Sequence, residues 1–397
     1  MKKSICFVLG LSLWYACQTP EKKPIVATEN SVISTETIDS NRIALRAASN
    51  FELTKHEHIQ NAYYLEIFKP WTGATTSAKY VLVPKEELAK IRFMPPNDVQ
   101  LIAYPIENIV CTSTIQAAML NKLGLSDKIV AMTEGETLYD ADLYAKVQSG
   151  KILDLGSNQQ VNYEKLMTAQ PELMLIFGMN APSRMLSKLQ EMQVSHLYMA
   201  EYLETSPVGR AEWIKILGIL FGKGDMANDI FEKEIFWPYN ALAKDAKMKA
   251  VSKTRPKVLT GIAHEGQWFV AGGQSLMAKM IADAQGDYLY ASDTNKGSMP
   301  YAFEKVYMDG ANATIWLDVW QAKNKADLAK MNANYTKLTA YRQDAVFSYL
   351  KRVSQNGGYD IFESAIVQPH LLLKDLVTIF HSDKLSNDSL YYYQRLQ

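Results

Sequence analysis

The sequence predicts an α/β protein with two lobes, each built on a mostly parallel sheet, joined by one long helix. Short apolar strands alternate with helices from about residue 101 to 206. A helix-rich section follows from 207 to about 251, and the alternation returns after Arg255-Pro256. Such alternation is typical of parallel sheets covered by helices. The chain has 397 residues, which is enough for two lobes with cores of their own.

The first residues are typical of an export signal. Lys2 and Lys3 precede an apolar run over residues 5–15, which ends at Ala16-Cys17. The run is too short to span a bilayer, which takes roughly 20 apolar residues. A cysteine after a small residue is what a lipoprotein signal requires, so we expect lipidation of Cys17. A plain secretory signal remains the alternative, because the two residues before Ala16 are bulky.

Composition excludes several classes of function. The chain has 42 Lys and Arg and 42 Asp and Glu, without a basic stripe, which disfavours nucleic-acid binding. Cys6 would leave with the signal and Cys17 would carry lipid, so Cys111 has no partner for an intramolecular disulfide. We interpret Cys111 as a small buried apolar residue. An enzyme is disfavoured, because the chain has no Gly-x-Ser-x-Gly elbow, phosphate loop or dinucleotide fingerprint.

Shifts in composition divide the chain into six segments. Residues after the signal are polar and rich in Thr, Ser, Glu and Lys, as in a disordered tether. Two strand-like runs, 62–68 and 78–84, flank the turn residues Pro70-Trp71-Thr72-Gly73 and predict a β-hairpin. We therefore expect a signal peptide (1–16), a lipid-attached tether (17–46), a β-hairpin extension (47–101), an N-terminal lobe (102–222), a linking helix (223–252) and a C-terminal lobe with a tail (253–397).

Within the lobes, apolar runs and helix-start residues predict the individual elements. Pro238 lies inside the helix expected over 225–249 and should kink or split it. The predicted strands are 108–111, 129–132, 173–177, 196–199, 258–262 and 315–317, and the predicted helices are 114–123, 163–169, 183–192, 275–284, 303–309 and 371–380.

A short repeat relates the two lobes. Tyr163-Glu164-Lys165-Leu166 and Phe303-Glu304-Lys305-Val306 each lead, at the same offset, to an apolar strand. Each lobe thus presents one glutamate in the first turn of an equivalent helix, where an acidic side chain is favoured. Generic helix-start chemistry is the alternative explanation.

Several motifs resemble those of the cobalamin and iron-siderophore class of periplasmic binding proteins, over about residues 106–381. Each motif is weak alone, but their order and spacing are specific. They are Asn108 to Thr114 with Leu123-Gly124-Leu125, Asp154-Leu155-Gly156, Asn162 to Leu166, Gln170 to Leu173, Gly209 to Trp213, Val270 to Ser275 and Gly357 to Ser364.

The resemblance implies two Rossmann-like lobes joined by a rigid helix, with a ligand held between them and little hinge closure. It also implies a binding protein that is not an enzyme and has no cofactor of its own. Its partner would be the permease of an ABC importer, whose Arg pockets receive Glu164 and Glu304, because carboxylate–guanidinium pairs steer association. The lipid anchor would hold it to a membrane, facing the periplasm. An exported surface scavenger without a transporter is the alternative.

Ligands in such folds bind at the carboxyl ends of the strands. Glycines there let the backbone approach a ligand, and aromatic rings offer flat apolar contact. This mixture suits a large ring or chelate better than a bare ion, so we expect a ferric siderophore, cobalamin or haem. The predicted ligand contacts are Thr112, Ser113, Thr133, Glu134, Ser157, Asn158, Met179, His264, Trp268, Gly273, Ser298, Met299, Tyr359 and Phe362.

Two features weigh on the choice of ligand. The related family often has an Arg before the Pro of its last helix, but Gln368-Pro369 stands here, which argues against a strongly anionic siderophore. Direct binding of Zn²⁺ or Mn²⁺ needs three or four converging ligands. His196, His264 and His370 are the candidates, although nothing in their spacing forces them together. The alternating spacing of His56 and His58 could place both rings on one face of a strand, but two ligands are not a site.

Overall fold

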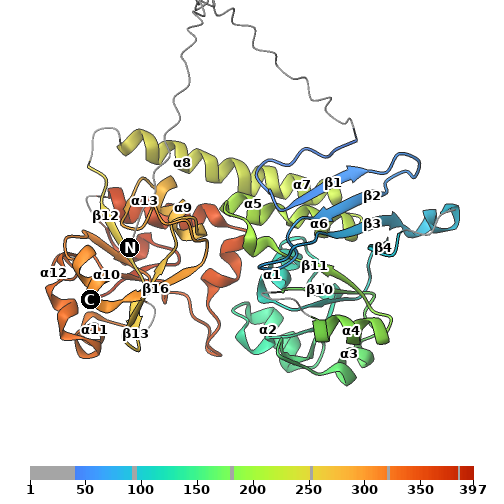
Figure 1. Ribbon diagram of the computed structural model, residues 1–397. Helices are drawn as coiled ribbons and strands as arrows, with labels where there is room; N and C mark the ends of the chain where they lie inside the picture. The colour runs from blue at the N-terminus through green and yellow to red at the C-terminus, as the bar shows by residue number, and fades with distance from the viewer. Residues whose placement is uncertain (1–40, 92–95, 179–182, 251–253, 320–321, 383–384) are drawn as a thin grey trace, which may run out of the picture. The chain divides into compact units, whose positions relative to one another are not determined.

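The computed structural model describes residues 41–91, 96–178, 183–250, 254–319, 322–382 and 385–397. The predicted signal, the lipidation of Cys17 and most of the tether therefore lie outside the described residues, and so does Met179. Residues 41–397 form one compact unit. Its two lobes lie on either side of the view in Figure 1, with the long helical section running from one to the other.

The N-terminal lobe is built on a five-stranded parallel sheet in the order β11-β10-β5-β6-β7. The inner strands β5 and β10 are fully buried apolar runs, as expected for a sheet covered on both faces. The predicted strands and helices are all present, with ends shifted by at most two residues. The strands are β5 (Ile109–Cys111), β6 (Ile129–Met132), β7 (Leu153–Asp154), β10 (Leu173–Ile176) and β11 (Ser195–Tyr198), and the helices are α1 (Thr114–Lys122), α2 (Ala141–Gln148), α3 (Tyr163–Ala169) and α4 (Ser183–Glu191).

The linking section contains α5 (Pro207–Glu212), α6 (Ile214–Leu220), α7 (Gly224–Ile230) and α8 (Trp237–Ala250). A π-helical turn, η5 (Phe231–Phe236), joins α7 to α8 without a break. Pro238 lies in the first turn of α8, directly after this turn. Proline has no N–H to donate, so the predicted irregularity takes the form of a wide turn rather than a split helix.

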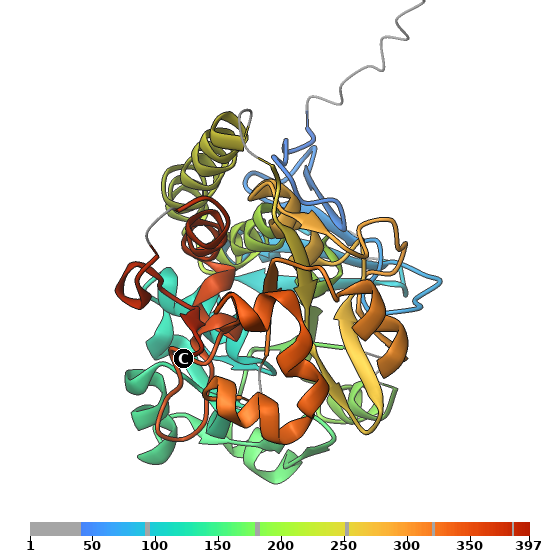
Figure 2. The same ribbon diagram turned by 90° about the vertical axis from the view of Figure 1, so that its left-hand side faces the viewer.

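The C-terminal lobe has less parallel sheet than predicted. A parallel sheet in the order β15-β12-β17 is accompanied by an antiparallel sheet in the order β13-β14-β16. Helices α13 and α8 pack side by side (Figure 2). The strands are β12 (Lys257–Thr260), β13 (Ile262–His264), β14 (Gln267–Ala271), β15 (Asp287–Tyr288), β16 (Ser298–Ala302) and β17 (Ile315–Leu317), the helices are α9 (Leu276–Asp283), α10 (Phe303–Asp309), α11 (Lys325–Met331), α12 (Thr339–Arg342) and α13 (Pro369–His381), and β18 (Phe347–Ser348) pairs with β19 (Gln394–Arg395).

The N-terminal extension is a four-stranded sheet, larger than the predicted hairpin. The hairpin is confirmed, because β2 (Tyr63–Ile67) and β3 (Ala78–Pro84) pair antiparallel. They are flanked by β1 (Phe51–Lys55), antiparallel to β2, and by β4 (Val99–Tyr104), parallel to β3. The side chain of Phe51 contacts the buried ring of Trp213, with centroids 5.0 Å apart. The sheet therefore shares the hydrophobic core of the lobe beside it.

Two buried carboxylates hold the chain just before β1. Glu212 accepts hydrogen bonds from the backbone N–H groups of Arg46, Ala47 and Ala48, at 2.8–3.1 Å. Glu204 accepts from the N–H groups of Ser49 and Asn50, at 2.9–3.1 Å. These bonds fix the residues that follow the tether onto the N-terminal lobe.

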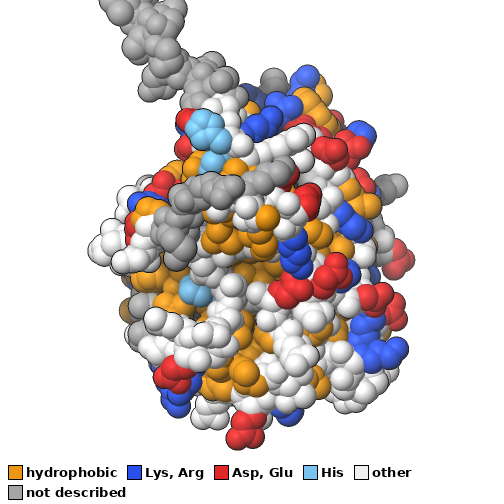
Figure 3. Space-filling view, turned by 90° about the vertical axis from the view of Figure 1, so that its right-hand side faces the viewer, with side chains coloured by type: hydrophobic (Ala, Val, Ile, Leu, Met, Phe, Trp, Pro, Cys, Tyr) orange, Lys and Arg blue, Asp and Glu red, His pale blue; other side chains and the backbone are white. Residues whose placement is uncertain are grey.

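The face on the right of Figure 1 is chemically mixed. Apolar side chains gather around a hollow near its middle, and acidic and basic side chains surround them (Figure 3). Among the described residues, we find no helix with both the length and the apolar character that crossing a membrane requires.

Candidate ligand-binding site between the lobes

An interlobe latch joins the loop after β6 to a segment of the C-terminal lobe. The Glu363 carboxylate accepts the backbone N–H groups of Tyr139 and Asp140, at 2.7 and 2.9 Å. Asn356 Nδ2 donates to the carbonyl of Leu138, at 2.7 Å. We define the interlobe latch as the contacts of Asn356, Gly358 and Glu363 with residues 136–140.

Close packing at the latch requires a glycine. A Cβ atom on Gly358 would lie 2.5 Å from the carbonyl oxygen of Leu138. Burial of Glu363 raises its pKa to about 7, and the two backbone N–H groups oppose that rise. The lobes are thus held together by direct backbone contact on one side of the region between them.

A cavity of about 210 Å³ lies between the lobes. Sites that enclose a whole ligand are usually about 300–1,000 Å³, so this cavity fits part of a larger ligand. Its walls are mostly apolar and come from α1, α5, α9, the 360–366 segment and α13, including Ile115, Arg210, Met277, Met280, Phe362 and Leu372.

The charged groups at this cavity are Arg210 and the neighbouring Glu201. Their closest N···O distance is 3.5 Å, and the Glu201 side chain is fully buried. Burial raises the pKa of Glu201, and Arg210 opposes that rise. Arg210 Nε has no hydrogen-bond partner among the described residues. The pair of Arg210 and Glu201 therefore adds little net charge to the cavity, and the N–H group at Arg210 Nε has no acceptor among the described residues.

Four of the predicted contacts of the N-terminal lobe, Thr112, Thr133, Glu134 and Asn158, meet in one hydrogen-bond network. Asn158 Nδ2 donates to the carbonyl of Thr112 at 2.9 Å, and the Asn158 N–H donates to Glu134 Oε1 at 3.0 Å. Thr133 Oγ1 donates to Asn158 Oδ1 at 2.8 Å. Thr112 Oγ1 accepts from the N–H of Phe177 at 2.6 Å. The network ties together the carboxyl ends of β5, β6 and β10.

This network corrects the expected roles of Thr112 and Thr133. Both are fully buried, and their hydroxyl groups hold neighbouring loops instead of facing a ligand. Ser113 caps α1, because its hydroxyl accepts from the N–H of Gln116 at 3.3 Å. Ser157 lies in the short hairpin of β8 (Gly156–Ser157) and β9 (Gln160–Val161), next to Asn158. Glu134, Ser157 and Asn158 remain partly exposed.

The interpretation of Trp268 as a ligand contact is wrong. Its side chain has no exposed surface, and its Nε1 donates to the carbonyl of Thr260 at 3.1 Å. Its ring packs against Phe303, Trp316 and Tyr335, with centroids 5.3–5.8 Å apart. Trp268 belongs to the core of the C-terminal lobe.

Other expected contacts of this lobe lie on the antiparallel sheet or beside it. Gly273 serves packing, because a Cβ there would lie 2.3 Å from the Asp293 carbonyl oxygen. His264 lies at the β13–β14 turn with its side chain 53% exposed. Ser298 and Met299 pair with Ala271 and Val270 across β14 and β16. The structure therefore does not bring these residues to the cavity at Arg210.

Three aromatic rings stand beside the cavity. Tyr349, Tyr359 and Phe362 contact one another, with centroids 5.3–6.2 Å apart. Phe362 lines the cavity and is 54% exposed, and Tyr359 is 37% exposed. Phe362 and Tyr359 thus lie beside the region between the lobes, and their contact with a ligand stays a prediction. Tyr349 was missed, since nothing in its sequence context distinguishes it from a core tyrosine.

The β2–β3 loop also reaches the carboxyl ends of strands in the N-terminal lobe. The Thr72 N–H donates to the hydroxyl of Tyr202 at 3.1 Å, and that hydroxyl donates to the carbonyl of Gly178 at 2.7 Å. The Trp71 ring lies 5.4 Å from that of Tyr198, at the end of β11. Only turn chemistry marked this loop in the sequence, so its position was not foreseen.

Glu164 and Glu304 occupy matching positions in the two lobes. They lie in the first turns of α3 and α10, which Figure 1 labels in separate lobes. Both side chains are exposed. Within the part of the chain that the structure describes, neither carboxylate forms an ion pair or accepts a hydrogen bond.

Two further observations concern the Cys111 thiol and the candidate metal ligands. Cys111 is buried, as the sequence predicted, and burial raises the pKa of its thiol, so the thiol stays protonated. No group of three or more His, Cys, Asp and Glu side chains converges as a metal site within the described ranges. His196, His264 and His370 are therefore not brought together there.

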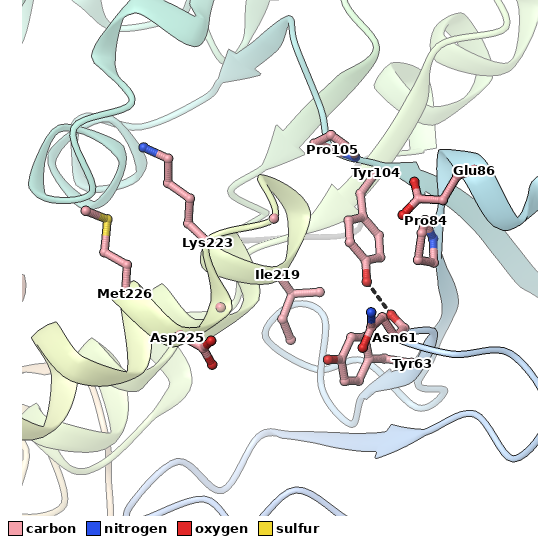
Figure 4. Close-up of a pocket in the computed structure, with 12 residues that line it drawn as sticks. Asn61, Tyr63, Pro84, Glu86, Tyr104, Pro105, Ile219, Lys223, Asp225 and Met226 are labelled. Carbon is pink, nitrogen blue, oxygen red and sulfur yellow. Dashed lines mark hydrogen bonds between the residues drawn. The ribbon is translucent and has the colours of Figure 1, made fainter.

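A second cavity, of about 610 Å³, lies between the N-terminal sheet and the α6–α7 turn (Figure 4). The Tyr104 hydroxyl donates to the carbonyl of Asn61 on its wall. Glu86 and Asp225 carry negative charge there, and Lys223 carries positive charge but points away from Tyr104. This mixture does not specify one class of ligand.

Comparisons with known proteins agree with this architecture. A family model described as periplasmic binding protein matches residues 109–353. An uncharacterised lipoprotein of Methanocaldococcus jannaschii is 22% identical over 403 residues, covering 94% of this chain and 91% of that one. A second uncharacterised lipoprotein of that organism is 25% identical over 338 residues, covering 80% of each chain.

Solved structures show the same fold at low identity. A periplasmic haem-binding protein from Pseudomonas aeruginosa is 18% identical with a TM-score of 0.54, covering 71% of this chain and 95% of that chain. A possible iron-binding, periplasmic solute-binding protein from Staphylococcus epidermidis is 16% identical with a TM-score of 0.52, covering 70% and 99%. Because the family model spans more than half of the chain, the protein belongs to the periplasmic binding protein family.

Proposed function

We propose that this protein captures a metal complex outside the inner membrane and delivers it to the permease of an ABC importer. The observation that carries the proposal is the pair of exposed glutamates, Glu164 and Glu304, on equivalent helices of the two lobes. Neither has a partner among the described residues, so both are available to a partner protein. A protein that only stored a ligand would not need the same free charge on each lobe.

The chemistry of a matching partner follows from these two carboxylates. Guanidinium groups bind carboxylates through two parallel hydrogen bonds, and such pairs set both orientation and association rate. A permease with one arginine pocket for each lobe would hold the region between the lobes over its entrance. The lobes would stay at a fixed angle, because the interlobe latch already joins them through Glu363 and Asn356.

The region between the lobes favours a bulky ligand with apolar surface. Phe362, Tyr359 and Tyr349 offer aromatic faces, and two methionines on α9 line the cavity beside them. The arginine there is paired with Glu201, which disfavours a strongly anionic chelate. Haem, cobalamin or a weakly charged ferric siderophore fits this chemistry. Structural relatives include the haem-binding protein and a protein of an Fe³⁺-hydroxamate transport system from Saccharomonospora viridis.

An anchor would keep such a protein near its importer. We include lipidation of Cys17 in the proposal, supported by the signal-like N-terminus and by two relatives named as lipoproteins. Labelling cells with a radioactive fatty acid tests it directly. Wild-type protein should incorporate label and Cys17→Ser should not, and equal labelling of both would contradict lipidation.

Reversing both docking charges tests the proposed function. The test uses cells that lack the chromosomal gene for this protein and measures which of haemin, cyanocobalamin and ferrioxamine the wild-type protein imports. We expect Glu164→Arg/Glu304→Arg to lower uptake of that compound at least tenfold, because each carboxylate–guanidinium contact becomes a repulsion. Probe binding to the purified variant should be unchanged. Glu57→Arg/Glu265→Arg is the matched control, with one exposed glutamate in each half of the chain. Full uptake by the first double variant would refute docking and favour a scavenger without a transporter.

Direct capture of Zn²⁺ or Mn²⁺ is the other ligand class that the sequence left open. No described observation favours it, because the three candidate histidines do not converge. Titration of the pure protein with either ion would show binding tighter than micromolar if that alternative were correct.

A further inference from the structure

The two glutamate helices also carry exposed methionines. Met308 on α10 is 69% exposed and Met167 on α3 is 51% exposed, which is unusual for large apolar side chains. A single exposed methionine needs no explanation, and Met248 and Met331 are similar. Met167 and Met308 differ because each shares a short helix with an unpaired glutamate.

Helix geometry places each methionine beside its glutamate. Met167 follows Glu164 by three residues, and Met308 follows Glu304 by four. Residues three or four apart lie on the same helix face, about 5–6 Å apart at Cβ. The opposite face of each helix is anchored in its lobe by a fully buried residue, Leu166 in α3 and Val306 in α10. The glutamate and the methionine therefore project outward together.

The lysine that follows each glutamate is engaged elsewhere. Lys165 Nζ donates to the carbonyl of Asp154 at 3.0 Å. Lys305 Nζ pairs with Asp309 at 2.7 Å and lies over the ring of Tyr301. Neither lysine neutralises the neighbouring glutamate. Each lobe thus presents a free carboxylate next to a flexible thioether, and we call these two surfaces the Glu-Met patches.

The combination has the chemistry of an interface contact. Methionine adapts its shape to a partner and is enriched in protein interfaces, where charged residues are depleted at the centre. Apolar atoms around an ion pair exclude water and so strengthen it. A carboxylate beside a methionine is therefore a better docking contact than a carboxylate alone.

We propose that Met167 and Met308 bind apolar surfaces of the permease, one beside each of its two arginine pockets. The inference rests on the proposed docking through Glu164 and Glu304. It adds that each arginine pocket has an apolar wall.

Substitution of the methionines by glutamine tests the inference, because glutamine keeps length and helix propensity but is polar. Fluorescently labelled protein would be titrated onto permease-containing membrane vesicles of the native host, with its unfolding midpoint and probe binding measured in parallel. We expect Met167→Gln/Met308→Gln to raise the Kd for vesicles at least tenfold, and each single variant to contribute a similar factor. The matched control is Met248→Gln/Met331→Gln, which should leave the Kd unchanged.

The outcomes separate this inference from the function on which it rests. Unchanged binding of the methionine double variant, with binding lost in Glu164→Arg/Glu304→Arg, would overturn the apolar contact and leave docking in place. An effect from only one methionine would overturn the apolar contact proposed for the other lobe. Unchanged binding in both double variants would overturn the proposed function itself.

Discussion

Replacing Glu212 with glutamine should detach the start of the folded chain from the N-terminal lobe. The Glu212 carboxylate accepts three backbone N–H groups, from Arg46, Ala47 and Ala48, and binds Lys215 Nζ at 2.7 Å. Its side chain is fully buried, and that of Lys215 is 9% exposed. The amide of glutamine keeps one acceptor oxygen and turns an NH₂ donor toward the other N–H groups.

The size of the effect follows from these contacts. Removing one partner of a buried ion pair costs about 3–5 kcal/mol, and each unsatisfied buried donor costs about 1–3 kcal/mol. Lys215 keeps some stabilisation from the Phe231 ring, 4.4 Å from its Nζ. We therefore expect Glu212→Gln to lower the free energy of unfolding by about 4 kcal/mol.

Urea denaturation measures this change, and limited proteolysis shows whether residues 46–50 become accessible. Glu212→Gln/Lys215→Met is the matched control, because it leaves no buried charge without a partner. In the Glu212→Gln background, Lys215→Met should restore about 2 kcal/mol. A decrease in the free energy of unfolding below about 1 kcal/mol for Glu212→Gln would refute the reasoning, because the hydrogen bonds of the buried carboxylate would then contribute little to stability.

Three more predictions concern the region between the lobes. Burial raises the pKa of Glu363 from 4.5 to about 7, so between these values the folded protein keeps a proton that the unfolded chain has lost. The free energy of unfolding of the wild type should therefore fall by about 3 kcal/mol relative to that of Glu363→Gln as pH rises through that range. Urea denaturation at several pH values measures this, and a difference between the two proteins that does not change with pH would contradict the raised pKa. Gly358→Ala places a Cβ against the Leu138 carbonyl and should cost about 1–3 kcal/mol of unfolding free energy, whereas Gly297→Ala, with open space around its Cβ, should cost less than about 1. Phe362→Ala should weaken binding of the cognate metal complex about tenfold, as measured by calorimetry. The unfolding midpoint should stay nearly unchanged, because the ring is 54% exposed. Equal binding by the variant and the wild type would show that this cavity is not part of the ligand-binding site.

Local signals explain why the elements were predictable. The strand Leu173–Ile176 is a continuous buried apolar run, and such runs mark the inside of a parallel sheet. Asn162 caps α3 by accepting the N–H of Lys165 at 2.9 Å, which a helix-start residue in the sequence already indicates. These signals depend on neighbours in the chain, so one sequence contains them.

The direction of individual side chains was less predictable. Trp268 and Phe269 are adjacent on β14, yet Trp268 is fully buried and Phe269 is 36% exposed. Adjacent strand residues point to opposite faces, and only the packing of the whole lobe decides which face is inside. For the same reason the roles expected for Thr112 and Thr133 were wrong: each directly follows its strand, but its hydroxyl group turns inward.

Contacts with the backbone left no trace in the sequence. Glu212 and Glu204 bind main-chain N–H groups of residues 46–50, and almost any residue types could supply those groups. Strand β4 pairs with β3 across the η1 (Lys85–Lys90) region, a separation that turn chemistry does not predict. The β2–β3 loop likewise reaches Tyr202 through its main chain. Because of these three features, the N-terminal extension has more strands, and more contacts with the N-terminal lobe, than the predicted hairpin.

The visible absorption spectrum and bound metal of the protein, purified from its native host, test the central claim most directly. We expect a bound chromophore that contains iron or cobalt, and a rise in the unfolding temperature when the same complex is added to the emptied protein, because a ligand far above its Kd must stabilise the folded state. A colourless, metal-free protein that gains no stability from haemin, cyanocobalamin or ferric siderophores would contradict capture of a metal complex.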